Sequence, residues 1–248
     1  ISSKNEVIKE AQTRFIKDQR DILCKSTDLT EPEFEKSMNL AGRALTEYVL
    51  FRQKTIDRLK KIDKKDRESE IHNILVPMKR ILRSGDFSQD IYINNTWILD
   101  DKFMTYSTVL SDMEMTDLLR ELTKGEVIKD DDRPDIAIIF SDDPKTTEKF
   151  DVVIVELKRK GLKPEDNVRV EVQLEKRARG LYGLYPDKVQ SLWLYGVVEL
   201  DNDYKSHLSS AGYHPLYSKG NVFVNTNDIT VDWESGIKIP AVRYILDF

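Results

Sequence analysis

The sequence predicts an α/β domain that is preceded by a helical arm. Three observations lead to this fold class: helical spacing of apolar residues in the first part of the chain, short β-rich segments from Phe87 onward, and helical patterns between those segments. Continuous apolar runs, rather than a clean period of two, are typical of a mixed sheet covered on both faces. We place the boundary near residue 64, with a helical arm at 1–64 and the α/β domain at 65–248.

The helical arm contains one long amphipathic pattern. Phe34, Met38 and Leu45 belong to a run of apolar residues spaced by three and four. Thr30 can cap the start of this helix, and Pro32 suits its first turn. We expect the arm to mediate self-association or attachment to a partner module. The helices expected before the first β-rich segment cover about 5–24, 31–62 and 65–82.

The α/β domain is predicted to alternate strands and helices. Its β-rich segments are bounded by polar and turn-forming residues, and two longer stretches between them have helical spacing. The expected strands are 91–99, 135–140, 151–157, 191–200, 221–225 and 241–246, and the expected helices are 102–122 and 167–183.

Composition limits the class of protein. Of 248 residues, 40% are hydrophobic and 33% are charged, which is typical of a soluble globular chain. No stretch has the length of a membrane span, and the N-terminus lacks the apolar core of a signal peptide, so we expect a cytoplasmic protein. The single cysteine, Cys24, rules out an internal disulfide framework.

The net charge of −5 argues at first against a nucleic-acid partner, because phosphate binding favours Lys and Arg. The segment 158–179 nevertheless contains eight basic residues against four acidic ones. A locally basic face is therefore available on an acidic protein.

Charged residues begin one apolar run and end the next. Asp135 begins "DIAIIF", and Glu156 and Lys158 end "DVVIVELK". If the two runs form a hairpin through the loop "SDDPKTTEK", the start of the first strand lies opposite the end of the second. This geometry brings Asp135 beside Glu156, and the alternation of side chains along a strand turns Glu156 and Lys158 to the same face.

Two interpretations of these three charges remain open from spacing alone. They could form a surface salt-bridge cluster, which contributes little to stability. They could also form a site, because carboxylate oxygens suit Mg²⁺ or Mn²⁺ and an ammonium group can orient a metal-bound water. The second interpretation predicts metal-assisted hydrolysis of a phosphodiester.

"RPD" followed some twenty residues later by "VELK" resembles the signature of the PD-(D/E)xK nuclease superfamily. The resemblance implies a restriction-endonuclease-like mixed sheet flanked by helices, with a core in αβββαβ order. It implies that Asp135, Glu156 and the carbonyl of Leu157 hold the metal and that Lys158 acts on water. A further glutamate usually comes from the preceding helix, for which we choose Glu70, with Glu68 as the neighbouring alternative.

Many members of the superfamily carry a glutamine and, four residues on, a tyrosine on the helix after the lysine strand. Here Gln173 is followed at that spacing by Arg177, so the tyrosine role is in doubt. Arg169 lies one turn earlier on the same helical face. This face could meet a phosphate backbone, or it could be a solvated surface. The residues expected to contact nucleic acid are Gln173, Arg177, Arg169, Arg159 and Lys160.

Segments between about 70 and 175 are also similar to the C-terminal nuclease-like part of bacterial proteins with a GHKL-type ATPase module, several of them associated with anti-phage defence. This similarity implies an ATPase module outside these 248 residues. The leading hypothesis is a Mg²⁺- or Mn²⁺-dependent nuclease, with DNA favoured over RNA, in a homo-oligomer. The alternatives are a non-catalytic nucleic-acid-binding or assembly module that keeps the nuclease fold, and a purely structural interaction domain.

Overall fold

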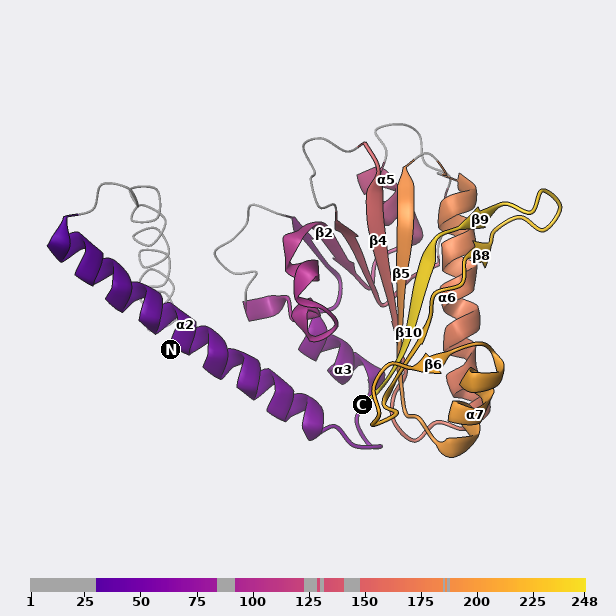
Figure 1. The fold of residues 1–248 in the computed structure, drawn as a ribbon, viewed down its shortest axis with the longest axis horizontal. Coiled ribbons are helices and arrows are strands. Elements are labelled where there is room, and N and C mark those ends of the chain that lie inside the picture. The colour runs from indigo at the N-terminus through magenta and orange to yellow at the C-terminus, as the bar shows by residue number, and fades with distance from the viewer. Residues whose placement is uncertain are drawn as a thin grey trace.

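The computed structural model describes residues 30–83, 92–122, 129, 132–140, 148–184, 186 and 188–248. The helix predicted at 5–24 lies outside the described residues. In the described part, a long helix leads into an eight-stranded mixed sheet with helices packed against it, which agrees with the predicted α/β class (Figure 1). None of the helices described there is long and apolar enough to cross a membrane.

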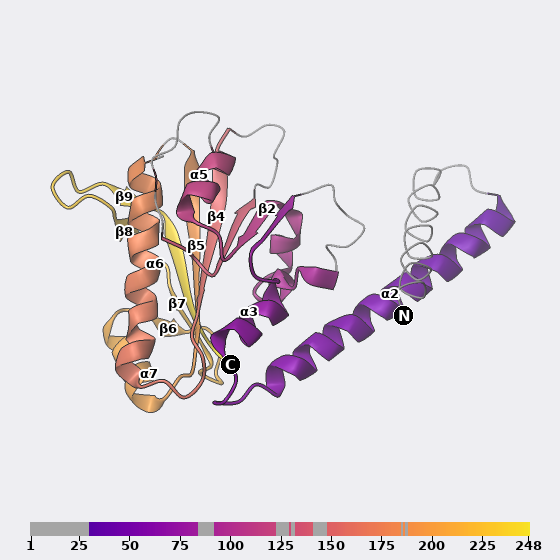
Figure 2. The same cartoon turned by 180° about the vertical axis from the view of Figure 1, so that it is seen from behind.

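Helix α2, Glu31–Lys60, confirms the long helix predicted at 31–62. Its start follows from the local sequence, since the backbone N–H of Thr30 donates to the Glu33 carboxylate at 2.9 Å and Pro32 lies in the first turn. Figures 1 and 2 show α2 as a rod that reaches the body of the protein at its C-terminal end and extends away from it at the other.

The large sheet has the strand order β1-β2-β3-β4-β5-β10-β7-β6. Its first four strands form an antiparallel meander, β4, β5 and β10 run parallel, and β7 and β6 continue antiparallel. The strands are β1 Arg80–Arg83, β2 Tyr106–Ser111, β3 Ile136–Phe140, β4 Phe150–Leu157, β5 Val189–Val198, β6 His214–Pro215, β7 Val222–Asn225 and β10 Ala241–Asp247, and a separate pair comprises β8 Ile229–Thr230 and β9 Lys238–Ile239.

Helices pack on both faces of this sheet (Figure 2). Even-numbered residues of β4, such as Ile154, share a core with Leu174 of α6, and odd-numbered residues, such as Val155, share a second core with Ile71 of α3. Gly196 of β5 allows α6 to approach, because a Cβ there would lie 3.1 Å from Val170 and 2.8 Å from Ile245. The remaining helices are α3 Glu68–Leu75, α5 Met115–Leu122, α6 Pro164–Leu184 and α7 Asn202–Ser210, with 3-10 turns η1 Thr96–Ile98 and η2 Asp101–Thr105.

Three predicted elements were wrong. In place of the helix expected at 65–82, helix α3 ends at Leu75. The last residues of the predicted range, from Arg80, belong to strand β1. The strand expected at 91–99 contains the 3-10 turn η1 instead. The helix expected at 102–122 contains η2, then β2, and only then the short helix α5. Pairing of β2 with both β1 and β3 stabilises an extended backbone in a segment whose apolar spacing was also compatible with a helix.

Candidate functional site

The hairpin of β3 and β4 positions the first two predicted site residues. Ile136 pairs with Val155 in antiparallel register, so the preceding Asp135 lies opposite Glu156, as predicted. The Asp135 carboxylate accepts a hydrogen bond from the backbone N–H of Leu157 at 2.6 Å. Burial raises the pKa of Asp135, whereas this hydrogen bond and the charges of Lys158 and Arg177 lower it.

Glu156 is buried, with only 2% of its surface exposed. Its carboxylate accepts a hydrogen bond from Nε of Arg177, on helix α6, whose side chain is 9% exposed. Arg177 also donates to the carbonyl oxygen of Arg133 at 2.6 Å, so groups from both strands, at the same end of the hairpin, hold its guanidinium. The pKa of Glu156 is raised to about 7, because burial and then the Asp135 charge raise it more than Arg177 and Lys158 lower it.

Lys158 follows the end of β4 and is partly buried. Its backbone N–H donates to the carbonyl oxygen of Val197 at 2.9 Å, which continues the pairing with β5 beyond the strand. The positive charge of its side chain acts on Asp135, Glu156 and Glu68. One cation is thus close enough to influence three carboxylates from three different elements.

The helix-borne acid in this group is Glu68 rather than Glu70. Glu68 is the first residue of α3, and its carboxylate lies close enough to Lys158, Asp135 and the backbone of Arg159 for all three to affect its pKa. Burial raises its pKa, Lys158 lowers it, and Asp135 raises it. The exposed Glu70 instead accepts the backbone N–H of Arg67 at 3.0 Å, which completes the capping box of its own helix.

Two further groups lie beside this cluster, of which Asp112 was missed from the sequence. Asp112 follows β2 with φ +52°, and its backbone N–H donates to the carbonyl oxygen of Asp135 at 2.8 Å. His72, on α3, is buried with Nε2 at 2.8 Å from Oγ of Ser111, and burial lowers its pKa to about 4 despite the charge of Asp112. His72 is therefore neutral at pH 7 and bonds to Ser111 at the end of β2. The β-branched pair Thr108 and Val109 favours a strand that would end just before Asp112. The helix predicted at 102–122 was preferred instead, so Asp112 was not considered as a residue at the end of a strand.

The predicted nucleic-acid contacts lie in different environments. Arg177 is held inside the protein against Glu156, Gln173 one turn earlier is partly buried, and Arg169 is exposed and pairs with Asp166 at 3.6 Å. Helix α6 therefore presents only the N-terminal part of the predicted face to solvent.

Two further residues were predicted to contact nucleic acid. Arg159 is exposed next to the carboxylates. Lys160 donates to the carbonyl oxygen of Ile62 at 3.3 Å and lies over the ring of Phe248, so it helps to hold the end of the arm against the sheet domain.

The donor atoms are of a kind that suits a hard divalent cation. Asp135 and Glu156 each use one oxygen in the bonds described above, and each carboxylate has a second oxygen that can bind a cation. Among the described residues, no group of three or more His, Cys, Asp or Glu side chains is arranged to hold a metal. Two carboxylates are a donor set that Mg²⁺ or Mn²⁺ accepts together with retained waters.

Comparisons with protein-family models, curated proteins and solved structures gave no match for this chain.

Proposed function

We propose that the protein is a divalent-metal-dependent nuclease that hydrolyses phosphodiesters, with DNA as the favoured substrate. The observation that carries this proposal is the register of the β3–β4 hairpin, which sets Asp135 opposite Glu156 with Lys158 two residues further on. A surface salt-bridge cluster does not account for this arrangement, because Glu156 and Arg177 are both buried. Burying charge costs free energy, so a buried ion pair is weak evidence for a purely stabilising role.

The order of elements also supports the proposal. Helix α3, strands β2, β3 and β4, helix α6 and strand β5 occur along the chain in αβββαβ order, with the short helix α5 inserted between β2 and β3. This is the order of the restriction-endonuclease-like core that the sequence resemblance implies. Strand β1, inserted after α3, is an addition to that order at the outer edge of the sheet.

Each residue of the proposed site would have a defined part in the reaction. Asp135 and Glu156 would hold Mg²⁺ or Mn²⁺, with Leu157 contributing its carbonyl oxygen. The cation would supply Lewis acidity and lower the pKa of bound water. Lys158 would orient the attacking water and offset the negative charge that develops on the phosphate. Glu68, whose carboxylate interacts with the charge of Lys158, would help to position the ammonium group.

A cleavage assay on the purified chain tests the proposal. Parent protein should cut DNA or RNA in the presence of Mg²⁺ or Mn²⁺ and lose this activity with a chelator. Asp135→Asn and Lys158→Ala should each reduce cleavage by at least about 100-fold, the size expected for an essential acid–base or electrostatic group. Lys238→Ala, an exposed lysine on β9, is the matched control and should cut like the parent. Absence of metal-dependent cleavage, or full activity of both site variants, would refute the proposal.

A non-catalytic module that binds nucleic acid is the second candidate. The observation that favours it is the ion pair of Arg177 with Glu156, because this guanidinium partly neutralises the acidic group without a metal. Such a module would bind nucleic acid without added metal, with affinity that falls steeply as salt rises, and would cut nothing. The placement among anti-phage defence proteins and the separate ATPase module stay predictions.

A further inference from the structure

Two basic segments of the chain lie beside the proposed site. The junction segment, 58–67, covers the end of helix α2 and its connection to α3, and the β4–α6 loop, 158–163, follows the strand that carries Glu156. The junction segment reads "RLKKIDKKDR" and the loop reads "KRKGLK". Together they contain ten basic and two acidic residues, although the net charge of the whole chain is −5. Positive charge is thus concentrated in two short parts of an acidic protein.

Direct contacts hold the two segments together. Nζ of Lys160 donates to the carbonyl oxygen of Ile62 at 3.3 Å. Gly161, with φ +78°, lies so close to the junction segment that a Cβ there would be 3.1 Å from the side chain of Lys64. Directly after β5, Glu199 accepts the backbone N–H of Gly161 at 2.7 Å and pairs with Lys64 at 3.5 Å. The two segments therefore form one basic surface, although Ile62 and Lys160 are 98 positions apart in the sequence.

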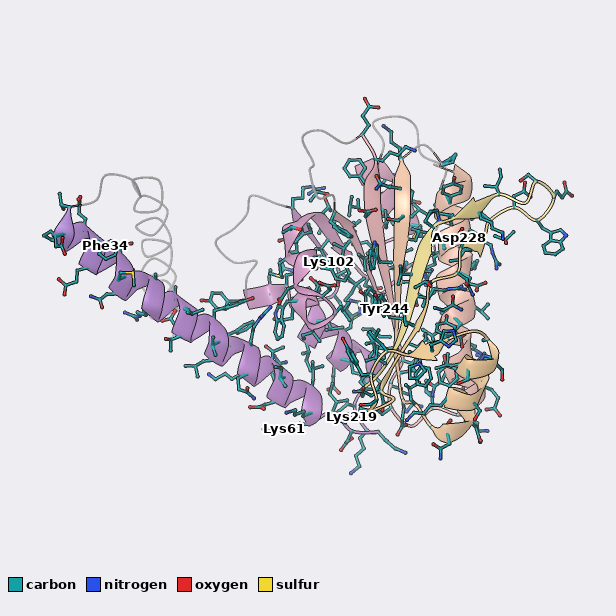
Figure 3. The ribbon with its side chains drawn as sticks, viewed as in Figure 1. Phe34, Lys61, Lys102, Lys219, Asp228 and Tyr244 are labelled. Atoms are coloured by element: carbon teal, nitrogen blue, oxygen red, sulfur yellow. The ribbon has the colours of Figure 1, made fainter. Side chains whose placement is uncertain are left out.

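Several cations of this surface are available to a partner. Lys61, Lys65 and Arg159 are exposed and form no ion pair with the residues that the structure describes. The two aspartates of the junction segment bind its own backbone, because Asp63 accepts the N–H of Lys65 at 2.7 Å and Asp66 accepts the N–H of Asp63 at 2.8 Å. Figure 3 labels Lys61 at the end of α2 that reaches the body of the protein. Exposed positive charges in such a group attract a polyanion.

The basic surface adjoins the carboxylates of the proposed site. Lys158, the first residue of the β4–α6 loop, acts with its charge on Asp135 and Glu156. Glu68 follows the junction segment directly and lies close to Lys158 and to the backbone of Arg159. A phosphodiester bound at the site would have its neighbouring phosphates within reach of this surface, because a nucleic-acid strand carries a phosphate at every nucleotide.

We propose that the surface formed by the junction segment and the β4–α6 loop binds the sugar–phosphate backbone of nucleic acid on one side of the bond that is cut. This inference rests on the proposed function and extends it, because it assigns the connection between arm and sheet domain to substrate binding. Lysine and arginine contacts to phosphates carry no base information, so binding should not depend on base sequence. Charge alone would also fit an anionic membrane, but continuity with a phosphodiester site favours nucleic acid.

Fluorescence anisotropy with a labelled DNA oligonucleotide of mixed sequence measures binding by the full chain, with a chelator present so that no strand is cut. Replacing Lys61 and Lys65 together by glutamine should weaken binding by at least about tenfold, because two phosphate contacts are lost. The plot of log affinity against log salt concentration should become shallower by about two. The matched control replaces two exposed lysines on other elements, Lys36 near the start of α2 and Lys238 on β9, by glutamine. It removes the same charge and should bind DNA like the parent.

Cleavage kinetics of the same variants separate this surface from the nuclease activity. In metal-dependent cleavage, the variant without Lys61 and Lys65 should have a raised KM and a kcat within about twofold of the parent value, since these lysines hold neighbouring phosphates and not the reacting one. Equal DNA binding by the parent and this variant, or an equal loss in the control, would overturn the inference and leave the proposed function standing. Lysine-dependent binding without any cleavage would support the surface and refute the nuclease.

Vesicles of phosphatidylserine and phosphatidylcholine test the other source of anionic groups. The parent should bind DNA in preference to these vesicles. Vesicle binding that is lost when Lys61 and Lys65 are replaced, together with no binding of DNA, would assign the surface to a membrane and overturn the proposal.

Discussion

Replacing Glu156 by glutamine should change how the stability of the protein depends on pH. Glu156 is buried beside Asp135, and burial raises its pKa from 4.5 to about 7. The folded state therefore retains a proton on Glu156 at pH values where the unfolded chain has released it. Ionising this carboxylate in the folded protein costs free energy, so its contribution to stability is full below about pH 4.5 and declines as the pH rises through 7. Glutamine cannot ionise, and it can still accept the hydrogen bond from Arg177.

The size of the effect follows from the two pKa values. One pKa unit corresponds to about 1.4 kcal/mol, and most of the interval between 4.5 and 7 is crossed between about pH 5 and pH 8. Relative to the glutamine variant, the parent should lose about 2 to 3 kcal/mol of unfolding free energy across that range. This is a large share of the stability of an ordinary domain.

Guanidinium denaturation of both proteins, at several pH values and in the presence of a chelator, measures this difference. Glu234→Gln changes an exposed carboxylate far from the site and serves as the control, whose stability should run parallel to that of the parent. Parallel curves for the parent and Glu156→Gln, or a parent that gains stability relative to the variant as the pH rises, would refute the account of a buried, destabilised carboxylate.

Two further pairs of variants test the site and the packing. Glu68→Gln should lower the rate of metal-dependent cleavage by about tenfold or more, because it removes the charge that interacts with Lys158. Glu70→Gln should leave the cleavage rate unchanged, because glutamine also completes a capping box. Gly196→Ala should destabilise the protein by about 1 to 3 kcal/mol, since its Cβ would lie 2.8 Å from Ile245. Gly183→Ala, whose Cβ would meet nothing within 4 Å, should be neutral or slightly stabilising, as denaturation curves will show.

The strands that carry the site were predictable because they are continuous runs of β-branched and apolar residues. Strands β3 and β4 lie close to their predicted bounds, and their pairing follows from the short polar loop between them. Strand β2 was not predictable in this way. The apolar positions in and around its six residues also fit helical spacing, so the sequence pattern does not distinguish strand from helix there. Pairing with β1 and β3 stabilises the extended conformation.

The choice between Glu68 and Glu70 depended on where helix α3 begins. With a start near residue 65, both glutamates would lie in the body of the helix. The actual N-cap is Arg67, which makes Glu70 the third residue of the helix and bonds its carboxylate to the Arg67 N–H. Helix boundaries are the least certain feature of a sequence pattern. A shift of about three residues was enough to change which carboxylate belongs to the site.

Arg177 connects the departure from the superfamily pattern with the electrostatics of the site. A tyrosine four residues after Gln173 would bring no charge to the hairpin, whereas the guanidinium donates to Glu156 and to the Arg133 carbonyl. Two carboxylates so close to each other repel, and either a proton on Glu156 or a nearby cation offsets that repulsion. In the protein alone, Arg177 and Lys158 provide the positive charge. If the proposed metal binds, it must share the Glu156 carboxylate with Arg177 or displace Arg177 from it. Arg177→Met should therefore raise the apparent metal affinity, measured by metal titration, and lower the stability of the metal-free protein, measured by denaturation. If both quantities stay unchanged, Arg177 does not act on the metal site.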